Sequence, residues 1–357
     1  MSLLFRKEEI MNKIIVPVGY MGSGSSAITH LMSEYKGYDA KHGEFEYVFL
    51  HCPNGVFDLE DKLLVGNNAL RSDEALHTFL KEMTKLYQKK YYWVGHYKEI
   101  VGEAFLDDVK DYIDTLIDYR SDYYWYVQED TSKKMVIQLI FKRIVETLSF
   151  HKIKLPKPLL YPQAWLSYPT PEKFYQASHD FIYKTLNHIG LKDRNIILDQ
   201  LLLPHNLHRI DHYFDDDLHC FVISRDPRDV FIINKYIWAY TNEVVPYEKD
   251  VHRFCQQYRL IRSLEKTTSS NKVHRFQFED FIYNYEHTVS DVESILGLTP
   301  NDHINPKKAF NPDISINNTQ LFRLEKYKEE VSVIEQELKD YLYDFPYVRI
   351  PDEKKIF

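Results

Sequence analysis

The chain has 357 residues, of which 44% are hydrophobic and 27% charged, and its formal net charge is −8 at pH 7. This length allows one large domain, or two ordinary ones, with a substantial core. The acidic balance excludes a general attraction to nucleic acid polymers or to an anionic membrane, so any anion site must be built locally.

The cysteines and the N-terminus indicate the cellular compartment. Three cysteines, Cys52, Cys220 and Cys255, are far apart and fit neither a zinc site nor a disulfide framework, which favours free thiols in a reducing compartment. The first residues, MSLLFRKEEIMNK, lack the apolar stretch of a signal peptide, and no run approaches the ~20 apolar residues of a membrane span. We therefore expect a cytoplasmic protein without a membrane span.

The first elements predict an α/β fold. KIIVPV (13–18) has the pattern of a short buried strand, a glycine- and serine-rich loop follows at 19–26, and a helix begins at about Ser26. EFEYVFL (44–50) is predicted to be a second strand. Strand, loop, helix and strand in succession indicate a parallel sheet.

The middle of the chain has a different character. From about Arg71 to Lys154 the pattern is long, charged and helical, and residues 155–172 contain five prolines that would return the chain to the sheet. We predict one domain over 1–357, with a core at 13–70 and 180–345 and a mostly helical, aromatic-rich insertion at about 71–179.

The α/β pattern resumes after the insertion. The predicted elements are a helix at 172–190, strands at 194–199, 219–224 and 272–281, a helix at 202–214 and a charged terminal helix at 323–342. HCFVIS (219–224) is almost entirely apolar, as a buried parallel strand should be. The sequence thus predicts a central parallel sheet flanked by helices in three layers.

The first loop, GYMGSGSS (19–26), has the spacing of a phosphate-binding P-loop, G-x-x-x-x-G-K-[ST], with Ser25 in place of the lysine. Its glycines would let the backbone approach an anion closely, and its serines would add hydroxyl donors. The residues concerned are Gly22, Ser23, Gly24, Ser25 and Ser26. Without the lysine, the loop suits one terminal phosphate better than a magnesium triphosphate. A turn that binds no ligand is the alternative.

A second loop, SRDPRDV (224–230), directly follows the apolar strand 219–224. Arg225 would lie at the carboxyl end of that strand, where ligands bind in open α/β sheets, and its planar guanidinium suits a phosphate. Asp229 would orient an arginine or cap the next helix. The alternative is a surface turn held by Arg–Asp ion pairs.

Together, the two loops resemble the PAPS-dependent sulfotransferases, which have a P-loop NTPase-like fold. In that family the first loop holds the 5′-phosphosulfate of PAPS, and an R-[DN]-P-[RK]-D-V motif after a strand holds the 3′-phosphate. FQFEDFIYNYEHTVSDVESILGL resembles the end of the family's domain, and KKAFNPDISINNTQLF (307–322) resembles the segment that closes over the nucleotide. The resemblance covers roughly 13–60 and 190–345.

The sequence departs from the family pattern at two positions. Gly22 stands where the family usually has Lys or Arg, and Ile233 stands where it usually has a serine that follows the motif. The resemblance makes Asn234 the substitute donor and Lys307 and Lys308 the candidates for the missing cation.

The resemblance implies transfer of a sulfuryl group from PAPS to a hydroxyl or amine, with no metal required. A general base would take the acceptor's proton, and the family places it near the second strand, which makes Glu44, Glu46 and His51 the candidates. Asp199 and Gln200, which follow the predicted strand 194–199, would contact the acceptor. Clusters of tyrosine and tryptophan at 91–97 and 119–126 favour a small-molecule or saccharide acceptor, or else pack the helices.

Two other functions stay open at this point. A P-loop kinase or NTPase would use Asp199 as the acidic residue after a strand, although Ser25 argues against it. A catalytically inactive nucleotide-binding relative is the other, supported by Gly22 and Ile233. His205, His208 and His212 share one helical face, but a surface position is favoured over a metal site.

Overall fold

The computed structural model describes residues 12–20, 22–40, 45–88, 94–121, 132–159, 161, 163–238 and 247–356. The chain divides into two compact units. The first unit consists of Met1–Val48 and Ile189–Phe357, and the second unit is Phe49–His188.

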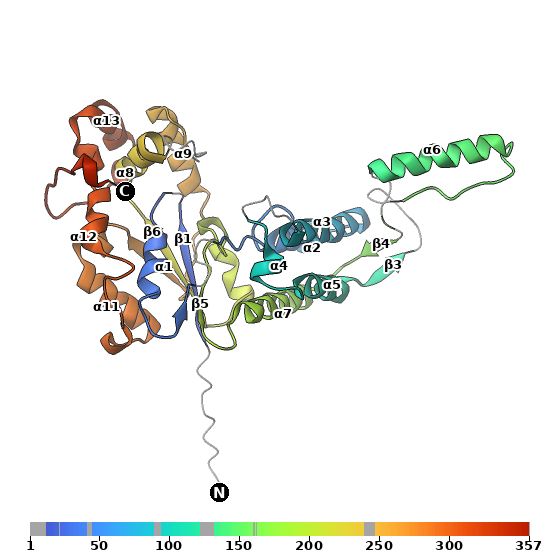
Figure 1. The fold of residues 1–357 in the computed structure, drawn as a ribbon, viewed down its shortest axis with the longest axis horizontal. Helices are drawn as coiled ribbons and strands as arrows, with labels where there is room; N and C mark the ends of the chain where they lie inside the picture. Colours follow the sequence, from blue (N-terminus) through green and yellow to red (C-terminus); the bar gives the residue numbers. More distant parts are fainter. Residues whose placement is uncertain are drawn as a thin grey trace, which may run out of the picture. The chain divides into compact units, whose positions relative to one another are not determined.

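The first unit is built on a five-stranded sheet in the order β2-β5-β1-β6-β7 (Figure 1). All neighbouring strands are parallel. The strands are β1 (Ile14–Gly19), β2 (Tyr38–Asp39), β5 (Asn195–Ile197), β6 (Leu218–Ser224) and β7 (Val273–Gln277). The predicted fold class, a central parallel sheet flanked by helices, is confirmed.

β1 pairs with β6 over its whole length, from Ile14 opposite Leu218 to Gly19 opposite Ile223. Five of the six residues of β1 are buried, so both faces of this central strand are covered. Because parallel strands end at the same edge of a sheet, the loops that follow β1 and β6 leave the sheet side by side.

Two hydrophobic clusters hold the helices of the first unit. One joins Ile15 and Phe221 of the sheet to α1 (Ser26–Met32), α10 (Asp280–Tyr283) and α11 (Tyr285–Leu296). The other joins α8 (Pro227–Ile232), the π-helical turn η3 (Ile233–Ile237), α9 (Val251–Ser263) and α13 (Lys328–Glu337). The remaining helical turns are η2 (Pro204–His212), η5 (Pro300–Asp302), α12 (Pro312–Ser315), η6 (Ile316–Asn318), η7 (Leu321–Arg323), η8 (Glu325–Tyr327), η9 (Lys339–Tyr341) and η10 (Glu353–Lys355).

The second unit is mostly helical. Its elements are α2 (Val56–Leu64), α3 (Ala69–Gln88), α4 (Tyr97–Ile100), α5 (Phe105–Leu116), α6 (Lys133–Leu148), α7 (Pro171–Ile189) and an antiparallel pair, β3 (Tyr119–Ser121) with β4 (Ala164–Leu166). Aromatic rings form its core: Phe181 stacks on Tyr112 at 4.8 Å between ring centroids and meets Phe79 edge-on. Tyr97 and Tyr112 are buried here as packing residues.

The predicted strand at 44–50 is wrong over its described residues. Residues 45–48 are irregular, and a turn begins at Phe49. Tyr47 N–H donates to the carbonyl of Asp199 at 3.0 Å, but the carbonyls of Phe49 and Leu50 accept from Val56 and Phe57 at the beginning of α2. The backbone groups that a strand would need are therefore used by the turn, and β2 (Tyr38–Asp39) takes the place beside β5.

Candidate functional site

The glycine-rich loop connects β1, the central strand, to α1. Gly22 and Gly24 have φ angles of +82° and +81°, a conformation that only glycine adopts without strain. Ser23 is buried, and its hydroxyl accepts from Tyr20 N–H at 3.1 Å. Ser23 therefore holds the loop together from within, whereas Ser25 and Ser26 face the cavity described next.

A cavity of about 330 Å³ lies beside this loop. Three parts of the first unit line it: the loop and the first turns of α1, the ends of β6 and β7 with η3, and the segment 309–318. The lining residues are Gly22, Gly24, Ser25, Ser26, Ala27, His30, Arg225, Trp238, Phe278, Ala309, Phe310, Ser315 and Asn318. The two loops predicted from the sequence thus meet at one cavity.

Arg225 is the buried cation of this cavity, with 4% of its surface exposed. Its guanidinium lies over the ring of Phe278, 4.5 Å from the ring centroid, and one Nη donates to the carbonyl of Asn318. Among the described residues, its buried Nε has no hydrogen-bond partner. Because a buried donor without a partner is costly, this nitrogen has the character of a ligand-binding group.

Carboxylates surround Arg225. Burial lowers the pKa of Arg225, and the charges of Asp229, Glu279 and Asp226 oppose this effect. Burial and repulsion from Asp226 in turn raise the pKa values of Asp229 and Glu279. Arginine keeps its proton at neutral pH, so the group stays positive and can bind an anion.

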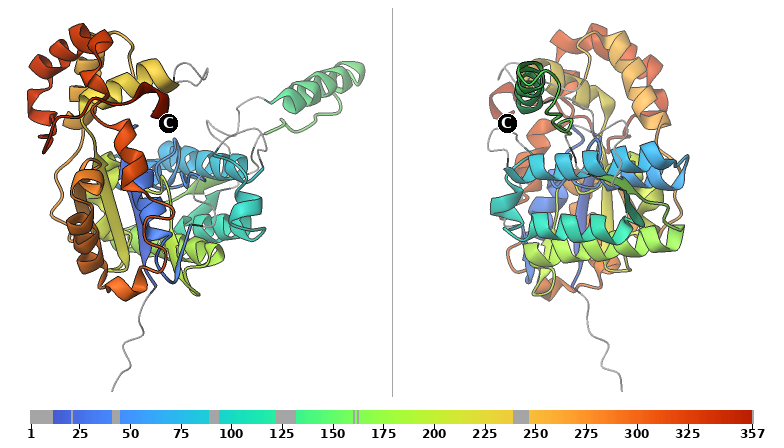
Figure 2. Two further views of the ribbon diagram at one scale, coloured as in Figure 1. Left: turned by 60° about the vertical axis from the view of Figure 1, so that its left-hand side comes forward. Right: turned by 90° about the vertical axis from the view of Figure 1, so that its right-hand side faces the viewer.

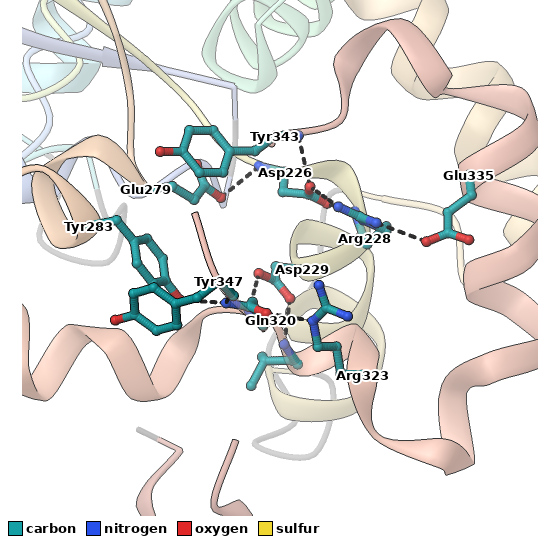
Figure 3. A network of polar contacts seen from close by, with 11 residues as sticks. Asp226, Arg228, Asp229, Glu279, Tyr283, Gln320, Arg323, Glu335, Tyr343 and Tyr347 are labelled. Atoms are coloured by element: carbon teal, nitrogen blue, oxygen red, sulfur yellow. Dashed lines mark hydrogen bonds and ion pairs between the residues drawn. The ribbon is translucent and has the colours of Figure 1, made fainter. Parts of the chain in front are cut away.

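Asp226 and Asp229 have separate structural roles (Figure 3). Asp226 is the N-cap of α8, accepting from Arg228 N–H at 2.9 Å. Asp229 accepts from the backbone N–H groups of Gln320 and Leu321, both at 2.8 Å. The cap considered for Asp229 is thus supplied by Asp226, and Asp229 instead holds the chain segment that follows Asn318.

Arg228, the second arginine of the motif, is occupied elsewhere. Its guanidinium pairs with Asp226 at 2.7 Å and Glu335 at 2.8 Å (Figure 3). It also stacks on Phe322, 3.7 Å from the ring centroid. Arg228 does not line the cavity. Of the two arginines, Arg225 alone is in position to meet a ligand there.

Asn234 and Trp238 fill the space over Gly22. A Cβ atom added at Gly22 would lie 2.9 Å from Nδ2 of Asn234 and 3.4 Å from the Trp238 ring. Asn234 is buried, and its Nδ2 donates to the carbonyl of Val230 at 2.9 Å. Ile233 is fully buried in the cluster around α8 and α9. A side chain at the position where a family member would carry a cation would therefore have to displace Asn234, at a backbone φ that favours glycine.

Neither lysine expected to replace that cation lines the cavity. Lys307 pairs with Glu286 at 3.3 Å and lies over the ring of Tyr285, and Lys308 is exposed. The same segment brings Ala309 and Phe310 to the cavity instead. His30, which the sequence reasoning missed, adds a side chain that can carry positive charge. Its position one helical turn after Ser26 was a usable signal.

Glu34 fixes the segment that closes the cavity. Its carboxylate is 1% exposed and accepts hydrogen bonds from one side chain and three backbone N–H groups. The donors are His303 Nε2 (2.7 Å), Lys307 N (3.1 Å), Ala309 N (2.7 Å) and Phe310 N (2.8 Å). A single buried carboxylate at the end of α1 thus positions two residues that line the cavity.

Glu46 and Asp199 lie near each other beyond the end of β5. Burial, and then the charge of Asp199, raise the pKa of Glu46 to about 7, and burial raises the pKa of Asp199 to about 6. Oδ1 of Asp199 accepts from Gln200 N–H at 3.0 Å, and Gln200 itself has a left-handed φ of 55°. A carboxylate whose pKa lies near neutrality is suited to proton transfer.

The other candidate bases are placed differently. Glu44 lies outside the described residues. His51 belongs to the second unit, in the turn before α2. His205, His208 and His212 are on η2, and His205 Nε2 lies 3.0 Å from the carbonyl of Ile261. Within the described part of the chain, no group of three or more His, Cys, Asp and Glu side chains is placed to hold a metal ion.

Comparison with known proteins gives structural likenesses only. No protein-family model matches the sequence, and no curated protein matches it. Similar solved structures include the sulfotransferase domain of the Synechococcus PCC 7002 olefin synthase, at 12% identity and a TM-score of 0.38, covering 96% of this chain and 99% of that one. Sulfotransferase STF9 from Mycobacterium avium has 12% identity and a TM-score of 0.37, with 96% and 79% coverage.

The sulfotransferase domain from the curacin biosynthetic pathway is similar at 11% identity and a TM-score of 0.32, covering 83% of this chain and 77% of that one. Each of these three neighbours is a sulfotransferase or a sulfotransferase domain.

Proposed function

We propose that the protein is a PAPS-dependent sulfotransferase that moves a sulfuryl group to a hydroxyl or amine acceptor. The observation that carries the proposal is that Arg225 and the lysine-free loop line one cavity, where the Nε of Arg225 is buried without a partner among the described residues. One anion on the loop and a second on Arg225 match a nucleotide with separate 5′ and 3′ phosphates.

The arrangement disfavours a magnesium triphosphate. A P-loop NTPase uses its loop lysine at the β- and γ-phosphates, and the corresponding Ser25 is uncharged. The positive side chain of Arg225 instead enters from the end of β6, the strand adjacent to β1. Of the two alternatives to a sulfotransferase, a kinase is therefore the weaker.

The proposed reaction is an in-line displacement at sulfur. The acceptor oxygen or nitrogen forms a bond to sulfur while the bond from sulfur to the 5′-phosphate oxygen breaks, and the products are the sulfated acceptor and adenosine 3′,5′-bisphosphate. Glu46, which lies beside Asp199 beyond the end of β5, is the candidate to take the acceptor's proton, and its raised pKa suits a base at neutral pH. The backbone of the glycine loop and the hydroxyls of Ser25 and Ser26 stabilise the leaving phosphate.

The acceptor class that we propose to test first is a saccharide. Much of the aromatic stretches 91–97 and 119–126 lies outside the described residues, and of the described tyrosines in them, Tyr97 is buried while Tyr119 is 61% exposed. An acceptor panel should therefore include simple alcohols and amines beside saccharides.

The proposal is tested by ligand discrimination. The melting temperature of the full chain should rise on titration with adenosine 3′,5′-bisphosphate and stay unchanged with ATP and magnesium, because only a ligand of the native state stabilises it. Stabilisation by ATP and magnesium alone would refute the proposal. Binding of the bisphosphate without sulfate transfer from PAPS to any acceptor would favour the inactive nucleotide-binding relative.

A further inference from the structure

Helix α6 (Lys133–Leu148) of the second unit carries an uncovered apolar stripe. Six of its side chains are between 46% and 76% exposed: Val136, Ile137, Ile140, Phe141, Ile144 and Leu148. At 3.6 residues per turn these positions fall within an arc of about 140°. A contiguous exposed surface of this kind on a helix marks an interaction site rather than ordinary surface variation.

The opposite side of α6 is covered by the chain itself. Residues 150–159 return alongside the helix (Figure 2), and Lys142 donates to the carbonyl of Leu155 and pairs with Glu146 at 2.5 Å. Leu155, Pro156 and Pro158 line a surface hollow together with Gln138 and Phe141. The returning segment thus lies on the Lys142 side, borders the apolar stripe only at its edge residue Phe141, and leaves the stripe exposed.

The charge of this helix and its return is opposite to that of the whole chain. Residues 132–157 contain seven Lys and Arg side chains and one Glu, a net of +6 in a chain whose total is −8. On the helical projection, Lys134 borders the apolar arc on one side and Arg143 on the other. Positive side chains at both borders of an apolar stripe are typical of helices that lie in the headgroup region of a membrane.

We propose that α6 and its return segment dock the protein on an anionic lipid bilayer. The stripe would enter the boundary between headgroups and acyl chains, and the flanking Lys and Arg would extend to the lipid phosphates. Among the described residues, no helix is both long and apolar enough to cross a bilayer. The contact is therefore peripheral. Pairing of this face with a second copy would bring two sets of like charges together, which opposes self-association. This inference does not depend on the proposed enzymatic function.

The test is flotation of the full chain with vesicles of phosphatidylcholine, alone or mixed with phosphatidylglycerol. Binding should occur on the mixed vesicles and weaken as salt is raised. The double variant Ile140→Ser with Ile144→Ser should lower the partition coefficient by about tenfold per side chain. Lys134→Gln with Arg143→Gln should lower it by about fivefold per charge removed.

Matched controls separate docking from general surface effects. Leu260 and Leu264 in the first unit have the same spacing and are 59% and 60% exposed, so replacing both by Ser should leave partitioning unchanged. Lys192→Gln with Lys339→Gln, at two exposed positions of the first unit, is the control for charge. Circular dichroism of each variant confirms folding.

Absence of binding by the unmodified chain, or binding that the stripe variant retains, would overturn the proposal. If the unmodified chain does not bind vesicles but forms a dimer in light scattering, and the stripe variant is monomeric, the stripe is instead a contact with a second copy of the chain.

Discussion

The ring of Phe278 lies directly against Gly24. A Cβ atom added at Gly24 would be 2.7 Å from Cδ2 of Phe278, and the guanidinium of Arg225 lies over the same ring, 4.5 Å from its centroid. One aromatic ring after β7 therefore sets the spacing between the glycine loop and the buried arginine. This spacing decides which ligand can reach both groups.

Gly24→Ala should disturb the site more than it disturbs the fold. At φ +81°, a Cβ costs roughly 1–2 kcal/mol of stability, and the contact with Phe278 must also be relieved by moving the ring. We expect affinity for adenosine 3′,5′-bisphosphate to fall about tenfold or more, measured by calorimetry. Gly297→Ala is the control, because that glycine also has a positive φ but a Cβ there meets nothing within 4 Å. Equal affinity losses in both variants would contradict the role of Phe278.

Glu34→Gln should loosen the closing segment. An amide offers one acceptor oxygen where the carboxylate offers two, and its NH₂ group would face the N–H groups that now donate to Glu34. A loss of roughly 1–3 kcal/mol in the unfolding free energy is expected, together with about tenfold weaker bisphosphate binding.

Glu293→Gln provides the comparison for this variant. Glu293 is also a buried carboxylate, and it accepts from the hydroxyl of Tyr35 at 2.9 Å. The Glu293→Gln variant should be less stable than the unmodified chain but should bind adenosine 3′,5′-bisphosphate with the same affinity. If both variants bind the bisphosphate as the unmodified chain does, Glu34 has no positioning role.

Arg228→Ala should separate stability from binding. Its removal leaves the buried carboxylate of Asp226 without its ion pair. Breaking a fully buried pair costs on the order of 3–5 kcal/mol of unfolding free energy. The cost should be smaller here, because the second partner of Arg228, Glu335, is partly exposed to water. Chemical denaturation should show this loss. Affinity for the bisphosphate, measured where the variant is folded, should change less than about threefold. A loss of affinity comparable to that of an Arg225 variant would show that both arginines contact the ligand.

The pH dependence of activity tests Glu46 as the base. Because its pKa is raised to about 7, kcat/KM should rise with pH up to about that value and then level off. Glu46→Gln should lower kcat by about 10²–10⁴-fold. A profile of kcat/KM that is flat between about pH 5 and pH 8 would exclude Glu46 as the base.

The same shift predicts an effect on stability. The folded-state pKa of Glu46 lies above its ordinary value of 4.5, so the folded state holds the proton more tightly, and stability is lost as pH rises from 4.5 to about 7. At about pH 8, Glu46 is ionised in both the folded and the unfolded state, and the folded state bears the cost of the buried charge. Glu46→Gln should therefore melt at a higher temperature than the unmodified chain. A lower melting temperature would mean that the ionised carboxylate stabilises the fold.

Local patterns were enough to predict the centre of the fold. The apolar runs of β1 and β6 and the loops that follow them are contiguous in sequence, and their meeting at one edge follows from the geometry of parallel strands. The strand at 44–50 failed because its apolar pattern does not reveal that Phe49 and Leu50 accept from the beginning of α2. A buried turn and a buried strand can both be rich in apolar residues, so the composition of 44–50 does not distinguish them.

Long-range contacts account for what the sequence did not reveal at the site. The sequence predicted the closing segment, but its Lys307 lies against Tyr285 and Glu286. The reason is that Glu34 binds the backbone of this segment, although it is more than 270 residues earlier in the chain than Lys307. Likewise, nothing near Gly22 indicates that Asn234 and Trp238 occupy the space above it. Such contacts between distant segments leave no periodic signal in the sequence.

The most direct test of the account is the affinity of Arg225 variants for adenosine 3′,5′-bisphosphate, measured by calorimetry. Arg225→Ala removes the charge-assisted contacts, and Arg225→Lys keeps the charge without the planar fork. Arg253→Ala, which removes an exposed arginine paired with Glu248 at 2.9 Å, is the control. The account predicts a loss of about 30-fold or more for Arg225→Ala, a smaller loss for Arg225→Lys and none for Arg253→Ala. A folded Arg225→Ala variant that binds the bisphosphate as tightly as the unmodified chain would contradict it.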